Sequence, residues 1–183
     1  MKAIIRRFTK GEVTVPWHAA MVVVIAALAV GDTLPALRGR DLTGHGVRLP
    51  DATRGRVTLL SMGFTYESRF PVEAWTNRFR ADFGADRRVN FYEVPLIGGM
   101  GKLARGFIDG GMRKSTPKEL QDNVVTVYDE VSDWKKRMAD PGGDVAHVVL
   151  LDAKGRVVAR HTGAFDEAAY QRVADATRRV LAE

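Results

Sequence analysis

Cysteine is absent from this sequence, and its absence decides which chemistry the chain can perform. None of the 183 residues is a cysteine. The chain therefore has no thiol nucleophile, no disulfide, no thiolate zinc site and no ligand for an iron–sulfur cluster. Any reaction at a site in this chain must use other side chains.

The histidines do not form a metal-binding pattern. The sequence has four of them, and they are dispersed at His18, His45, His147 and His161. They lack the i, i+4 spacing and the clustered carboxylates that metal sites need. We therefore expect no metal ion, and nothing else in the sequence calls for a cofactor.

A glycine-rich stretch follows a predicted strand and formally satisfies G-x-G-x-x-A, the dinucleotide-binding phrase. It reads Gly99-Met100-Gly101-Lys102-Leu103-Ala104. A phosphate loop would need glycine at Leu96 and serine or threonine at Leu103, and the dinucleotide motif normally opens the first β-α-β unit. Hinge glycines are the favoured interpretation, and nucleotide binding is the alternative.

A basic segment with interspersed apolar residues spans residues 105–118. Its candidate partner-binding side chains are Arg105, Arg113, Lys114 and Lys118. We expect this segment to contact an acidic or membrane-embedded partner, and peripheral membrane association is a related expectation. The alternative is a solvated loop without a partner. The formal net charge of +6 is spread along the whole chain, which argues against a nucleic-acid groove.

The elements that must position these residues follow an α/β order. Apolar and β-branched runs predict strands at residues 40–42, 47–49, 57–64, 89–96, 124–128, 145–151 and 156–161. Pro71 and an apolar stripe through Trp75 predict a helix that ends at Gly84. Strands 57–64 and 89–96 should be parallel neighbours, and the last two strands should form an antiparallel hairpin.

The remaining helices are less regular. Glycines and Pro117 interrupt residues 97–123, which predicts an elaborated connection with one or two short helices. Ser132 is expected to cap a short helix over 132–138, and Asp166 is expected to cap the terminal helix.

The first thirty residues resemble a targeting segment. Basic residues precede an apolar run from Ala19 to Val30, which ends in Ala27-Leu28-Ala29, a pattern that signal peptidase could cut. The run is shorter than the roughly 20 residues that span a bilayer. We expect a signal-like segment over 1–30 and one domain over 31–183. The expected location is exported, periplasmic or membrane-associated, and an organellar or cytoplasmic location is the alternative. For the segment itself, the alternative to an export signal is a buried terminal element of the domain.

Several phrases resemble the thioredoxin-like and peroxiredoxin-like superfamily. Residues 31–35 read G-D-T-L-P, which is similar to the opening G-D-x-x-P phrase, and residues 148–163 resemble the final hairpin. The resemblance implies a thioredoxin-like α/β fold. Its central mixed β-sheet is flanked by helices, with an N-terminal hairpin and an elaborated central connection.

The resemblance also locates a lost active site. Residues 64–68 read F-T-Y-E-S where peroxiredoxins carry F-T-x-x-C, so Ser68 occupies the position of the peroxidatic cysteine. Ala146 stands where thioredoxins place a cis-proline. The joint loss implies a fold retained as a recognition surface, and it excludes the cysteine-dependent copper chaperones of the superfamily. The implied surface, called the rim below, comprises Thr65, Tyr66, Glu67, Ser68, Arg69, Ala146 and His147.

A narrower resemblance is to the mitochondrial ATPase assembly factors, cysteine-poor thioredoxin-like proteins that help to install a membrane subunit of the F-type ATP synthase. It rests on Trp75, on residues 111–119 and on residues 150–156. Residues 157–159 depart from the family, which favours an arginine-tryptophan pair there. The resemblance implies a non-enzymatic assembly chaperone or protein-binding module.

Two further functions stay open beside that one. The fold would bring His147 near Ser68, which makes a hydrolytic pair one alternative, although the sequence has no G-x-S-x-G elbow and no evident orienting acid. A redox-inactive, peroxiredoxin-like ligand-binding module is the other, and it would require an apolar pocket at the rim.

Overall fold

The computed structural model describes residues 25–99 and 101–183. Most of the expected targeting segment over 1–30 therefore lies outside the described residues. The elements in chain order are β1 (Leu37–Asp41), β2 (Gly46–Leu49), the 3-10 helix η1 (Asp51–Thr53), β3 (Val57–Gly63), α1 (Arg69–Phe83), β4 (Val89–Pro95), α2 (Lys102–Ser115), the 3-10 helix η2 (Lys118–Asn123), β5 (Val125–Thr126), α3 (Val131–Met138), β6 (Ala146–Leu151), β7 (Val157–Gly163) and α4 (Glu167–Ala182).

The central sheet has the strand order β4-β3-β6-β7. β3 and β4 are parallel and β6 and β7 are antiparallel, as the sequence predicts. β6 is also antiparallel to β3, which places the final hairpin beside the parallel pair. A second sheet has the order β2-β1-β5. Parallel bridges from Glu93 to Val124 and from Leu96 to Val127 join the chain around β5 to the edge strand β4.

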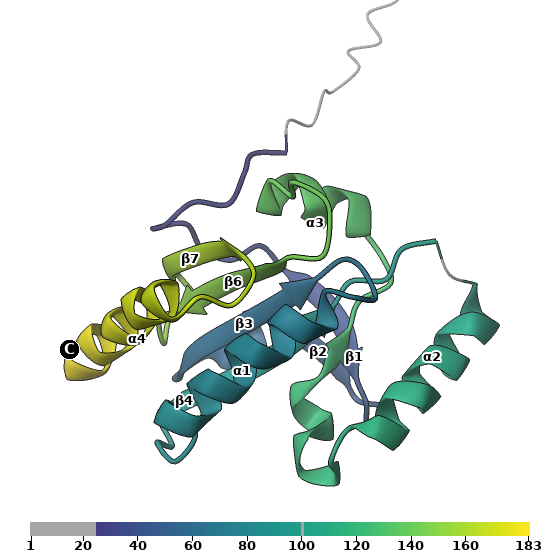
Figure 1. Cartoon of the computed structure of the whole chain (residues 1–183), viewed down its shortest axis with the longest axis horizontal. Helices are drawn as coiled ribbons and strands as arrows, with labels where there is room; N and C mark the ends of the chain where they lie inside the picture. Colours follow the sequence, from purple (N-terminus) through teal and green to yellow (C-terminus); the bar gives the residue numbers. More distant parts are fainter. Residues whose placement is uncertain (1–24, 100) are drawn as a thin grey trace, which may run out of the picture.

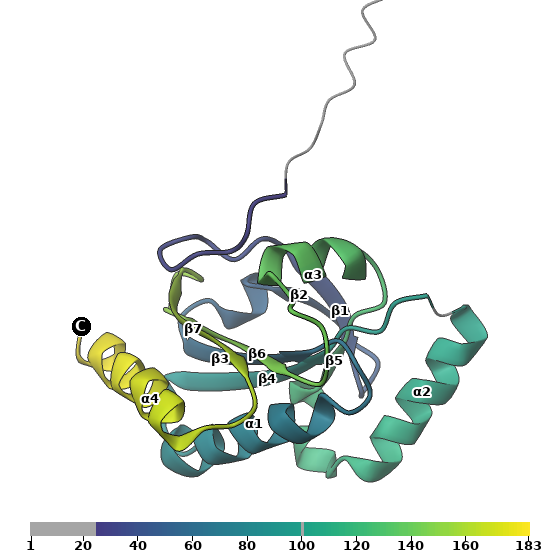
Figure 2. The ribbon, with the colours of Figure 1, turned by 45° about the horizontal axis from the view of Figure 1, so that its top comes forward.

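Helices cover both faces of the central sheet. On one face α1 and α4 bury Trp75, Phe79 and Tyr170 against β3 and β6. On the other face α3 and the β1–β2 hairpin bury Trp134 and Leu37. Figure 2 shows the sheet between α3 on one side and α1 with α4 on the other. The predicted apolar stripe of α1, including a core position for Trp75, is therefore confirmed.

Gly39 allows β1 to lie unusually close to β5. A Cβ at this position would lie 2.5 Å from Val125 Cγ1 and 2.6 Å from the Thr126 carbonyl oxygen. Both distances are shorter than real Cβ atoms tolerate, so only glycine permits this approach. The close contact holds the β1–β2 hairpin against β5 in the second sheet.

The chain begins to pack into the domain at Leu28. Its side chain is 4 % exposed and belongs to the core under α3. Its backbone N–H donates to the Arg137 carbonyl at 2.8 Å, and the Arg160 guanidinium donates to the Leu28 carbonyl. The packed region thus includes residues just before the expected boundary at residue 31. No helix in the described part of the chain is both long enough and apolar enough to cross a membrane.

The connection over 97–123 contains two helices, as expected, although the first of them, α2, is not short but has 14 residues; the second is the 3-10 helix η2. One local expectation is corrected. Ser132 does not cap α3, because Glu130 holds that position in a left-handed conformation and its carbonyl accepts the first helical N–H groups. Asp166 does cap α4, since its carboxylate accepts the Ala169 N–H at 2.7 Å.

Candidate functional site

Ser68, at the start of α1, belongs to a closed network of hydroxyl and carboxylate groups. Its Oγ lies 2.7 Å from Thr65 Oγ1, and Thr65 Oγ1 donates to Asp144 Oδ1 at 2.7 Å. The Thr65 N–H also donates to Ser68 Oγ at 3.2 Å. Ser68 is 1 % exposed, and Gly63 packs so tightly beneath it that a Cβ there would lie 2.8 Å from Ser68 Cβ. The hydroxyl is satisfied and screened from any substrate.

His147, on β6, has no exposed surface, and both of its ring nitrogens have partners. Nε2 lies 3.1 Å from Asp140 Oδ1, and Nδ1 lies 3.2 Å from Thr162 Oγ1. The ring also meets the edge of Phe64 at 5.2 Å between centroids. Burial lowers the pKa of His147, and the hydrogen bond to Asp140 opposes that shift. These contacts do not couple His147 to Ser68, so the geometry does not support a hydrolytic pair.

Ala146 is buried and pairs with Gly163 of β7. Within the described residues the cis peptide bond is Leu49–Pro50, so the bond before Ala146 is trans, as expected for a residue that is not proline. The loop that ends at Ala146 thus lacks the backbone turn that a cis-proline would supply.

The outer part of the rim is an exposed aromatic group formed by Tyr66, in the loop before α1, and by Arg69 and Phe70, in the first turn of α1. The Arg69 guanidinium carbon lies 4.0 Å from the centroid of the Tyr66 ring and 4.5 Å from that of Phe70. Tyr66 is 73 % exposed and Phe70 is 55 % exposed, and Glu67 beside them is exposed as well. Stacking with a guanidinium holds two aromatic rings at the surface. Phe70 was not among the predicted rim residues.

The four basic side chains predicted to bind a partner divide into two pairs. Arg105 donates to Asp129 at 3.0 Å and lies over the Tyr128 ring, and Arg113 donates to the Leu42 carbonyl. Both therefore attach α2 to the domain. Lys114 and Lys118 are exposed, and neither has an ion pair within the described residues.

The glycines around residue 100 lead into α2. Gly99 has a φ of +75°, and Gly101 precedes the first residue of the helix in an extended conformation. These glycines thus connect β4 to α2; whether they act as the expected hinge stays a prediction. Among the described residues, no group of three histidine or acidic side chains is placed to hold a metal ion.

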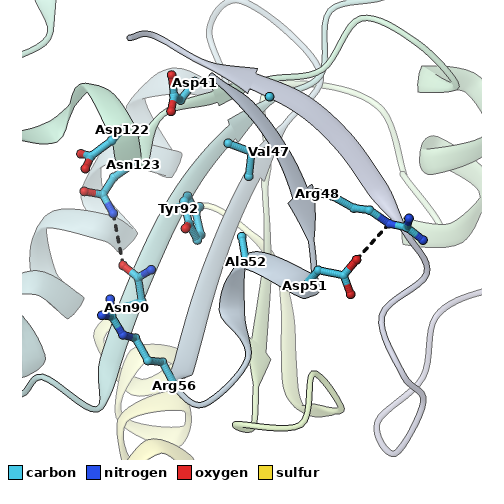
Figure 3. Close-up of a pocket in the computed structure, with 11 residues that line it drawn as sticks. Asp41, Val47, Arg48, Asp51, Ala52, Arg56, Asn90, Tyr92, Asp122 and Asn123 are labelled. Atoms are coloured by element: carbon cyan, nitrogen blue, oxygen red, sulfur yellow. Dashed lines mark hydrogen bonds and ion pairs between the residues drawn. The ribbon is translucent and has the colours of Figure 1, made fainter. Parts of the chain in front are cut away.

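A polar cavity of about 530 Å³ lies between the β1–β2 hairpin, β4 and the end of η2. Figure 3 shows the Tyr92 ring near its centre, with Asp122, Asn90 and Arg56 along one wall. Asn123 Nδ2 donates to Asn90 Oδ1 at 3.2 Å. Burial raises the pKa of Tyr92, and a hydrogen bond with Asn90 opposes the shift. The sequence analysis did not identify this cavity.

A second cavity, of about 310 Å³, separates α1 and β4 from residues 115–124. The Glu93 carboxyl faces it with Glu73, Thr76 and Arg80. Burial raises the pKa of Glu93 to about 7, and repulsion by Glu73 adds to the effect. A hydrogen bond from the Thr76 hydroxyl and the positive charge of Arg80 oppose the shift. In the described chain Glu93 has no ion pair.

Comparison with solved structures identifies the fold. The thioredoxin domain of a thiol-disulfide oxidoreductase from Bacteroides vulgatus is 22 % identical, with a TM-score of 0.56, and the match covers 81 % of this chain and 98 % of that one. A protein assigned as the thiol:disulfide interchange protein DsbE from Chlorobium tepidum is 21 % identical, with a TM-score of 0.55 and coverages of 85 % and 99 %.

A third solved structure comes from an assembly protein. BsSco, of the Sco family of cytochrome c oxidase assembly proteins, is 12 % identical, with a TM-score of 0.53 and coverages of 82 % and 97 %. No protein-family model matches the chain, and no curated protein matches it. The resemblance to the ATPase assembly factors therefore rests on sequence phrases alone.

These likenesses show the fold and nothing finer. The chain has a thioredoxin-like α/β fold with a mixed sheet flanked by helices. Two of these solved structures are named for thiol-disulfide chemistry, but this chain has no cysteine with which to perform that chemistry.

Proposed function

We propose that this chain is a redox-inactive thioredoxin-fold module that binds a protein client through the rim. One observation carries the proposal: the exposed stack of Tyr66, Arg69 and Phe70 lies beside the position that a catalytic cysteine would occupy. Aromatic and arginine side chains are the residue types most enriched at the centres of protein interfaces. Neighbouring aromatic rings exposed to water are typical of a surface that binds a partner.

The inner part of the rim supports binding rather than catalysis. The Ser68 hydroxyl is screened, and both nitrogens of His147 are occupied by Asp140 and Thr162. An activated nucleophile requires a base within hydrogen-bond reach, which these contacts do not provide. The inner groups instead fix the loop that presents Tyr66.

Site-specific photocrosslinking tests this proposal, because a single cysteine introduced into the cysteine-free chain is a unique attachment point. A benzophenone at Glu67→Cys should capture a discrete client in native extracts, whereas the same group at Lys154→Cys, in the exposed turn between β6 and β7, should not. Tyr66→Ser/Phe70→Ser should abolish capture at position 67. Equal capture from both positions, or capture that survives the double substitution, would refute binding at the rim.

The finer proposal names the client as a membrane subunit of the F-type ATP synthase. Its support is the likeness of residues 111–119 to the basic segment of the ATPase assembly factors. The same crosslinking from position 67 in native membranes, followed by identification of the captured protein, tests it. A captured client that is not a synthase component would exclude this role and leave the broader proposal intact.

Export of the chain is part of the proposal and rests on the basic residues and apolar run of its first thirty residues. Fractionation of host cells that express the tagged full chain provides the test. Recovery of the chain in the soluble cytoplasmic fraction would exclude export.

A second candidate function is the binding of a small polar ligand in the cavity around Tyr92. Its volume of about 530 Å³ falls within the range of ligand sites. Arg56 and Asp122 face it without an ion pair in the described chain, so they offer charges of both signs. A thermal-shift screen of nucleotides, amino acids and carboxylic acids should find a stabilising compound whose effect is lost in Arg56→Gln. A flat screen would remove this candidate.

A further inference from the structure

The outer face of α2 carries the most exposed large apolar side chains in the described part of the chain. Leu103 is 94 % exposed and Phe107 is 85 % exposed. Residues four apart lie one above the other on a helix, so the two side chains form one continuous apolar strip. Figure 1 and Figure 2 both show α2 standing apart from the body of the domain.

Polar contacts attach α2 to the domain along its opposite face. Tyr128 donates to Asp109 Oδ1 at 2.6 Å, and Arg113 donates to the Leu42 carbonyl. The Gln121 side chain donates to the Arg113 carbonyl at 2.9 Å, which secures the end of the helix. These contacts fix the orientation of α2, so the apolar strip faces outward because of the fold and not because the helix is loose.

The same outer face becomes basic toward the end of the helix. Lys114 lies eleven residues after Leu103, which is close to three whole turns, and therefore continues the strip. Lys118 follows at the start of η2, and both lysines are exposed. The acidic residue of α2, Asp109, is turned inward to Tyr128, and the first carboxylate after the helix is Glu119.

We propose that the outer face of α2 docks on an anionic lipid surface. Leu103 and Phe107 enter the boundary between headgroups and acyl chains, and Lys114 and Lys118 contact the lipid phosphates. Helices that lie in the membrane interface combine an apolar strip with flanking basic residues in this way. The face stands out from the domain, which suits a planar surface. A second copy of the chain would bring the same lysines against each other and add to a repulsion already set by the net charge of +6.

A fluorescent label tests the docking face directly, whatever the first thirty residues do. An environment-sensitive dye on Leu103→Cys in the full chain should shift to the blue with vesicles of phosphatidylcholine mixed with phosphatidylglycerol. It should not shift with phosphatidylcholine alone. The matched control is the same dye on Lys154→Cys, which should stay in water.

Substitutions without a label then measure each contribution by sedimentation with the same vesicles. Leu103→Ser/Phe107→Ser should lower the partition coefficient by a factor on the order of ten or more. Lys114→Gln and Lys118→Gln should each lower the partition coefficient about fivefold. Added salt should also lower it, because salt screens the attraction between the lysines and the lipid phosphates. Tyr66→Ser/Phe70→Ser, which removes the exposed rings of the rim, should leave partitioning unchanged. The rim substitutions therefore separate this inference from the proposed client binding.

Three results would overturn the inference. A label at position 103 that stays in water while the chain sediments with vesicles would show that another segment binds lipid. A blue shift that needs no vesicles and grows with protein concentration would identify a second copy as the occupant. Equal binding to neutral and anionic vesicles would remove the role of the two lysines.

Discussion

Glu93→Gln changes one partly buried carboxyl into a neutral group of nearly the same shape, and its effect on stability can be worked out from the structure. The Glu93 side chain faces the cavity between α1 and β4, where burial and Glu73 raise its pKa from 4.5 to about 7. The folded protein therefore holds a proton on Glu93 at pH values where the unfolded chain has released it. Stability must fall as the pH rises from about 4.5 to about 7.

The size of the effect follows from the shift. A difference of about 2.5 units at 1.36 kcal/mol per unit is about 3 kcal/mol of destabilisation, reached in full above about pH 7. Glu93→Gln cannot ionise, so it should be about 3 kcal/mol more stable than the parent at about pH 8. At about pH 5 the advantage should shrink to about 1 kcal/mol.

Urea unfolding followed by tryptophan fluorescence at about pH 5 and about pH 8 measures both values. The comparison uses the difference between variant and parent at each pH, so other titrating groups, including His147, cancel. Glu73→Gln is the matched control, because it should lower the Glu93 pKa and recover part of the same stability. A parent and a Glu93→Gln variant with parallel pH profiles would refute the reasoning.

Three other predictions concern the core. Gly39→Ala should cost about 2–3 kcal/mol of unfolding free energy because its Cβ would overlap β5, whereas Gly46→Ala, with open space around it, should cost less than about 0.5 kcal/mol; equal losses would contradict the close approach. Trp75→Phe should change stability by less than about 1 kcal/mol in urea unfolding, because relief of its buried indole N–H, which has no partner, offsets the lost volume. A loss of several kcal/mol in Trp75→Phe, typical of a large core truncation, would contradict this prediction. In a Glu93→Gln background the free energy of unfolding should decrease as the pH falls below about 6.5, because burial lowers the pKa of His147 and the folded state disfavours its charged form. His147→Leu should remove this pH dependence. A pH dependence that is unchanged in His147→Leu would show that another group causes it.

The regular half of the fold could be predicted because its signals are local. The stripe through Trp75 has helical spacing, and the short, mostly apolar run over 57–63 has the composition of a central strand, so α1 and β3 follow from the pattern. α2 was harder to predict. Gly106, Gly110 and Gly111 weaken its helix propensity, and tertiary contacts such as Arg113 to Leu42 compensate.

The candidate sites depend on contacts that local patterns do not encode. Ser68 and Thr65 could be placed by motif, but Thr65 bonds to Asp144, 79 residues away, and no spacing rule indicates that pair. Phe107 has the pattern of an ordinary inward-facing apolar residue, and only the packing shows that it is exposed. Phe70 lies off the apolar stripe of α1, so helical spacing places it outward, but its stacking on Arg69 is visible only in the structure. Glu93 alternates like a solvated strand residue, yet α1 and the chain at Val124 cover it.

The anchoring of Leu28 sets an order of events for any processing of the chain. A peptidase requires its substrate as an accessible, extended segment, but the Ala27-Leu28-Ala29 phrase is held by a buried side chain and by hydrogen bonds to Arg137 and Arg160. Cleavage after Ala29 therefore requires residues 27–29 to leave their place in the domain, either before folding is complete or by local opening of this terminal segment. Folding and maturation would compete kinetically for the same few residues, and the faster process would decide whether the finished domain keeps Leu28 in its core.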